Sequence, residues 1–73
     1  MELTTTFITY HRSGADLHLR TEHQIIFISK TEKEMIELAK SLERGQTIRV
    51  EGEQEMSSTI SNVVLKASKL EVI

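Results

Sequence analysis

The sequence predicts one domain, residues 1–73, that is mainly β with a single helix, in the order β-β-β-α-β-β. Segments of alternating apolar and polar residues, the pattern of strands with one wet face, lie on both sides of residues 31–44. Residues 31–44 instead repeat apolar side chains every three or four positions, the period of an amphipathic helix. A chain of 73 residues has room for one small hydrophobic core, which makes a single domain the expected organisation.

Three strands are expected before the helix. Residues 2–10 are rich in threonine and aromatic residues, which favour extended backbone. Gly14 supplies a turn, and residues 16–20 then alternate between leucines on one face and Asp16, His18 and Arg20 on a face expected to meet water. Residues 24–29 are apolar on both faces, which predicts a strand in the middle of the sheet.

The helix is predicted over residues 31–44. Thr31 and Glu34 have the spacing of a capping box, and Gly45 is placed to end the helix as a left-handed cap. The predicted buried stripe consists of Met35, Ile36, Leu38, Ala39 and Leu42.

Two strands are expected after the helix. Residues 46–51 place Ile48 and Val50 inward, and Gly52 is expected to turn the chain into a loop that runs to Ser58. The last strand, residues 62–73, changes parity. It has Val63, Leu65 and Ala67 on one face and Leu70 and Val72 on the other. Keeping both sets inward requires a bulge near Ser68 and Lys69.

Composition excludes several classes of function. The chain has no cysteine, hence no disulfide and no thiolate metal site, and no apolar run reaches the length of a membrane span. Its first residues lack the layout of a signal peptide, so we expect a cytoplasmic protein. No nucleophile elbow, phosphate loop or metalloprotease motif occurs, so we expect neither an enzyme nor a cofactor. His18, Asp16 and Arg20 supply too few ligands for a metal site.

The second half of the chain resembles an OB-fold domain, as found in single-stranded DNA-binding proteins and their small replication relatives. The resemblance covers mainly residues 24–73 and depends on the segments Leu-Glu-Arg-Gly-Gln-Thr-Ile-Arg-Val-Glu-Gly-Glu from Leu42 and Asn-Val-Val-Leu-Lys-Ala-Ser-Lys-Leu-Glu-Val-Ile from Asn62. It implies a five-stranded OB-like barrel with the helix between the third and fourth strands. The alternative is a β-grasp fold, which normally has only a hairpin before its helix.

The resemblance also implies a function and a site. OB-folds bind oligonucleotides through the second and third strands and the adjoining loops. By position, the candidate nucleic-acid-binding residues are Tyr10, His11, Arg12, His18, Arg20 and Phe27, together with the loop at 52–58. These residues supply the cations and flat rings that bind single strands. The implied function is non-catalytic binding of single-stranded DNA or RNA in replication, recombination or repair.

Other features favour different interpretations. Glu51, Glu53 and Glu55 would repel phosphate, and a strand phenylalanine such as Phe27 is more often core than stacking platform. The alternative function is a protein-interaction or regulatory subunit, of viral, plasmid or bacterial origin, whose acidic fourth strand and loop dock on a basic partner. A homo-oligomer is expected in either case, because neither proline nor lysine protects the edge of the first strand.

Overall fold

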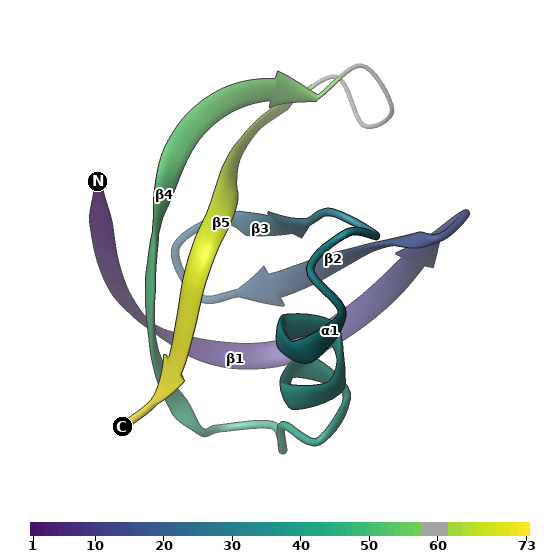
Figure 1. Cartoon of the computed structure of the whole chain (residues 1–73). Coiled ribbons are helices and arrows are strands. Elements are labelled where there is room, and N and C mark those ends of the chain that lie inside the picture. Colours follow the sequence, from purple (N-terminus) through teal and green to yellow (C-terminus); the bar gives the residue numbers. More distant parts are fainter. Residues whose placement is uncertain (58–61) are drawn as a thin grey trace.

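The computed structural model describes residues 1–57 and 62–73. Its elements are β1 (Glu2–Ser13), β2 (Asp16–Thr21), β3 (Ile25–Ile28), α1 (Lys33–Lys40), β4 (Thr47–Ser57) and β5 (Asn62–Val72). The predicted order is confirmed. The strands close into an OB-like barrel in the spatial order β1-β2-β3-β5-β4 (Figure 1), and this closure rules out the β-grasp alternative.

The barrel closes through one short parallel contact. Every other neighbouring pair of strands is antiparallel, whereas β3 and β5 run parallel. Their register pairs are Ile25 with Val64, Ile26 with Leu65, and Phe27 with Lys66. β3 thus lies between β2 and β5, as its apolar sequence predicted.

Alternating residues of all five strands fill the barrel interior. The largest fully buried side chains are Leu17, Leu19, Ile26, Ile28, Ile48, Val50 and Leu65. α1 adds Ala39, which is completely buried, and packs Met35, Ile36 and Leu38 against the core as partly buried side chains. Figure 1 shows α1 in the connection from β3 to β4. Within residues 1–57 and 62–73, no helix is long and apolar enough to cross a membrane.

The helix is shorter than predicted, because neither expected cap forms. Glu32 occupies the N-cap position without a side-chain hydrogen bond. The Thr31 hydroxyl instead shares a hydrogen bond of 3.1 Å with the Ser29 hydroxyl. Gly45 does have positive φ, at 97°, but it lies beyond the helix and donates its N–H to the carbonyl of Phe7 in β1. The predicted capping box and glycine cap are therefore wrong.

Gly52 does not turn the chain. It lies inside β4, which continues to Ser57, so Glu53 and Glu55 belong to a strand and not to a loop. Gly52 is buried. A Cβ atom at this position would lie 2.8 Å from the carbonyl carbon of Lys66 and would collide with that carbonyl group. Close approach of two backbones, not a turn, requires glycine here.

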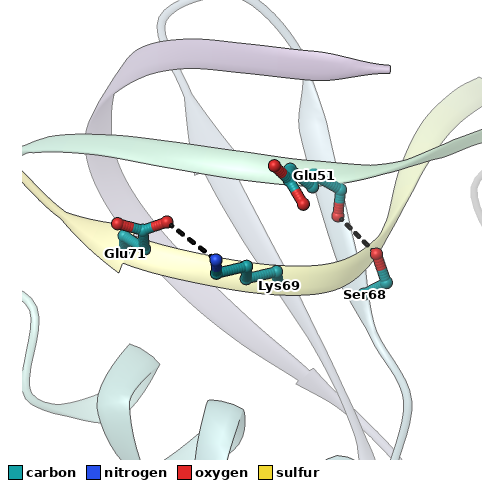
Figure 2. A network of polar contacts seen from close by, with 4 residues as sticks. All are labelled: Glu51, Ser68, Lys69 and Glu71. Carbon is teal, nitrogen blue, oxygen red and sulfur yellow. Dashed lines mark hydrogen bonds and ion pairs between the residues drawn. The ribbon is translucent and has the colours of Figure 1, made fainter.

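The predicted bulge in β5 is confirmed. Glu51 pairs with Lys69 and Gly52 pairs with Ala67, which leaves Ser68 as the extra residue. Its hydroxyl donates to the Glu51 carbonyl at 3.1 Å, next to an ion pair of 3.4 Å between Lys69 and Glu71 (Figure 2). The bulge turns both Ala67 and Leu70 inward, whereas Val63 and Val72 are exposed, contrary to expectation.

β1 is longer than predicted and bends. Its residues 2–6 pair with β4, whereas Phe7 and residues 9–13 pair with β2, and a register shift between Phe7 and Thr9 leaves Ile8 as an extra residue. The strand continues to Ser13, and a turn at Gly14, whose φ is 64°, leads directly into β2. Residues 11–13, which we expected in the turn with Gly14, are therefore part of the strand.

Candidate nucleic-acid interface

Four of the six predicted site residues come together on the outside of the barrel. One cross-strand row runs from His11 in β1 to His18 in β2 and Phe27 in β3, then to Lys66 in β5. Arg20 belongs to the next row, two residues along β2 and opposite Thr9 and Ile25. We name His11, His18, Arg20, Phe27 and Lys66 the outer β2–β3 face.

Strand alternation explains why these side chains point outward. Leu17 and Leu19 flank His18 in β2, and Ile26 and Ile28 flank Phe27 in β3, and all four are buried in the core. Because successive side chains of a strand point to opposite faces, the side chains of His18 and Phe27 must point to the outside of the barrel.

His18 and Phe27 form a packed ring pair. Their ring centroids are 5.3 Å apart and the planes are tilted by 57°, within the usual range for aromatic pairs. His18 is only 7% exposed, and its Nε2 atom has no hydrogen-bond partner within the described parts of the chain. The expectation that His18 belongs to a solvated strand face is wrong, because the side chain packs against Phe27. Phe27 itself is half-buried and keeps part of its surface accessible.

Tyr10 and Arg12 do not join this face. In the β1–β2 register Tyr10 lies opposite Leu19 and Arg12 opposite Leu17, and both leucines point into the barrel. Residues directly opposite each other share a face of the sheet, so Tyr10 and Arg12 lie on the other side of β1 from His11. Both side chains are exposed, Tyr10 at 38%.

Lys66 is a member of the face that sequence reasoning missed. It lies beside Phe27 because β3 and β5 pair in parallel, and its side chain is exposed. The lysine alone gives no signal of this position. Only the closed topology together with the register of the bulged β5 would have placed Lys66 next to Phe27.

The charges of the surface change sign along the two rows. Arg20 and Lys66 are exposed cations. Each row, however, ends in β4 at a glutamate. The row of Lys66 ends at Glu53, and the row of Arg20 passes through Val64 and ends at Glu55. The cations therefore flank the Phe27 ring, and the acids lie beyond β5 at the edge of the face.

The acids of β4 border an open hollow of about 610 Å³. We name it the acidic hollow after its five glutamates, which are Glu2, Glu32, Glu51, Glu53 and Glu55. Lys66 contributes a positive charge to its wall, and Gly52, Ala67 and Ser68 of the bulged region also line it. Within the described ranges, 1–57 and 62–73, no group of three or more histidine or acidic side chains is arranged to hold a metal ion.

No protein-family model and no curated protein matches the chain.

Proposed function

We propose that this protein is a non-catalytic OB-like barrel that binds single-stranded DNA or RNA on the outer β2–β3 face, in the cytoplasm, during replication, recombination or repair. One observation carries the proposal. The Phe27 ring, braced by His18, is half-exposed between the cations Arg20 and Lys66.

This arrangement supplies both interactions that single strands need. A nucleobase stacked on an aromatic ring contributes about 1 to 3 kcal/mol whatever its sequence, because every base has a π face. His18 holds the Phe27 ring from β2, which reduces the freedom that the ring would lose on binding. Arg20 and Lys66 are exposed on the strands on either side of β3, and in the proposed complex they contact the phosphates.

A titration with a fluorescein-labelled oligonucleotide of about 30 nucleotides, longer than the site of one OB-fold, tests the proposal by anisotropy at several salt concentrations. We expect Phe27→Ala to weaken binding by about 1 to 3 kcal/mol and to leave the salt dependence unchanged. Arg20→Ala and Lys66→Ala should each reduce the slope of log K against log salt by about one.

Arg12→Ala and Tyr10→Ala are the controls for Arg20→Ala and Phe27→Ala, because they remove a guanidinium group and an aromatic ring from the opposite face of β1. Arg12→Ala should change the salt slope less than Arg20→Ala does, and Tyr10→Ala should change the affinity for the oligonucleotide less than Phe27→Ala does. An equal effect of Arg12→Ala and Arg20→Ala would contradict this site, and absence of binding by the parent protein at low salt would contradict the function.

The acidic hollow favours a second candidate function, the docking of a basic protein. Five glutamates line one open surface, with only Lys66 against them among the charged side chains of its wall. Such a surface attracts cationic partners and repels nucleic acid. The same salt titration separates the two candidates, since the hollow gives no reason for an oligonucleotide to bind.

A further inference from the structure

Among the described residues, one edge of β4 has no partner strand over residues 53–57, past its contact with Met1. β1 and β4 pair up to their last contact, in which the Met1 amine donates to the Gly52 carbonyl at 2.9 Å and the Gly52 N–H donates to the Met1 carbonyl at 2.9 Å. β4 then continues through residues 53–57, paired with β5 on its other edge. Across residues 1–57 and 62–73, no strand pairs with this part of β4 on the side of β1.

The hydrogen-bonding groups on this edge can be assigned. Gly52 directs both its N–H and its C=O toward Met1. Since these directions alternate along a strand, Gln54 and Met56 direct theirs to the same edge, and Glu53 and Glu55 direct theirs to β5. The main-chain groups of Gln54 and Met56 therefore form a ready template for another strand.

The side chains beside this edge have a definite pattern. Glu53 and Glu55 are exposed on the face of the acidic hollow, in line with Glu51. Met56 lies on the other face and is 72% exposed. Residues directly opposite on a neighbouring strand share a face, so a strand added here would set alternate residues against glutamates and against Met56.

We propose that an extended basic segment of a partner protein adds to the free edge of β4 as a further, antiparallel strand, with its main chain bonded to Gln54 and Met56. Its lysines or arginines lie against Glu53 and Glu55, and its apolar residues lie beside Met56. This is the mode of recognition known as β-strand addition. The inference goes beyond nucleic-acid binding and rests on the second candidate function for the charge of the partner.

A symmetric pair of two copies centred on Gln54 is unfavourable at this edge. In such an antiparallel pair, Glu53 of each copy would lie opposite Glu55 of the other. Like charges directly opposite destabilise a sheet. In this register the charges of the edge therefore favour a basic strand over a second copy of the chain.

The test uses the whole chain and a fluorescein-labelled peptide of about eight residues in which lysine and valine alternate, long enough to span the free edge. In the proposed register the valines pair with Gln54 and Met56, so the valine amides point to β4 and the lysine amides point away. Two further peptides carry N-methyl groups on the valine amides or on the lysine amides. They have the same charge and composition.

We expect the valine-methylated peptide to bind at least about tenfold more weakly than the unmodified one, because its donors to β4 are blocked. The lysine-methylated peptide should bind within about twofold of the unmodified one, since its blocked amides face away from β4. Equal weakening by both modifications, or no binding of the unmodified peptide, would overturn the proposal.

Amide hydrogen exchange locates the peptide on the protein. Adding it should slow exchange at Gln54 and Met56 and leave Glu53 and Glu55, already bonded to β5, unchanged. The double variant Glu53→Gln with Glu55→Gln should bind the peptide more weakly, and the affinity should depend less on salt concentration. Arg20→Ala, a variant in β2 at a distance of three strands along its row from the free edge of β4, should bind the peptide normally, so failure of nucleic-acid binding and failure of strand addition are observed separately. Protection at another strand and not at Gln54 would refute the assignment to β4.

Discussion

His18 has an environment that stability alone does not explain. Its side chain is buried, and its Nε2 atom has no hydrogen-bond partner within the described residues. A buried polar atom left unsatisfied costs about 1 to 3 kcal/mol. What the residue supplies in return is a ring against Phe27.

Replacing His18 by phenylalanine should therefore stabilise the fold. The variant keeps a ring beside Phe27 and removes the unsatisfied nitrogen, so we expect the free energy of unfolding to rise by about 1 kcal/mol, measured by chemical denaturation. His11→Phe, at the exposed neighbouring position in the same row, is the control and should change little. A clear loss of stability in His18→Phe would mean that the nitrogen has a partner in solution.

Positions 52 and 14 require glycine for different physical reasons. A Cβ at Gly52 meets backbone, which cannot move aside, so Gly52→Ala should cost about 3 kcal/mol or more. Gly14 has positive φ but open space around it, so Gly14→Ala should cost only about 1 kcal/mol. Thermal and denaturant unfolding of the two variants measures both values. Equal losses would contradict the close contact between β4 and β5.

At the scale of elements, α1 begins without a side-chain cap. Glu32 stands at the N-cap with no hydrogen bond from its side chain, and its longer carboxylate replaces the short side chains usual there. Glu32→Ser should stabilise the protein by about 1 kcal/mol, since a serine oxygen can accept from the first free N–H groups of the helix.

Thr31→Ala is the matched control for this prediction. If Thr31 were the cap, its loss would strongly destabilise the protein, but among the described residues its hydroxyl contacts only Ser29, in an exposed hydrogen bond. We expect a change within about 0.5 kcal/mol in the same unfolding assay. If Thr31→Ala lowered the free energy of unfolding by more than Glu32→Ser raised it, Thr31 would be the cap, as the sequence predicted.

The elements show which sequence signals are specific. The order of strands and helix was predictable because the apolar period differs between them, and the bulge at Ser68 was predictable because the parity of buried residues changes across it. The role of Gly52 was not predictable. Glycine permits both a turn and a close approach of backbones, and only the position of Lys66 across the sheet distinguishes the two.

The site was predictable to the same limited extent. His18, Arg20 and Phe27 follow from alternation within β2 and β3, each read from its own segment. Tyr10 and Arg12 were placed on this face because β1 was expected to end at residue 10, whereas it continues in regular pairing with β2. Lys66 depends on pairing between strands far apart in sequence, which no local pattern encodes.

At the scale of the whole molecule, the acids of β4 oppose the proposed binding of nucleic acid on the outer β2–β3 face and favour the proposed addition of a basic strand at the edge of β4. Glu53→Gln with Glu55→Gln should raise the affinity for the oligonucleotide, because the two rows of the outer β2–β3 face end at these residues. The same double variant should lower the affinity for the lysine-valine peptide. Paired anisotropy titrations at one salt concentration measure both effects, and a change in the same direction for both ligands would contradict the separation of the two surfaces.

The short parallel contact between β3 and β5 has a consequence for the kinetics of folding. It joins segments distant in the chain across only three register pairs, so we expect it to form late, after the antiparallel hairpins. Interactions absent from the transition state affect the unfolding rate and not the folding rate. Phe27 and Lys66 lie on opposite sides of this contact. A nucleic-acid strand resting on both would hold the barrel closed and slow its unfolding, while the rate at which the free chain folds stays the same.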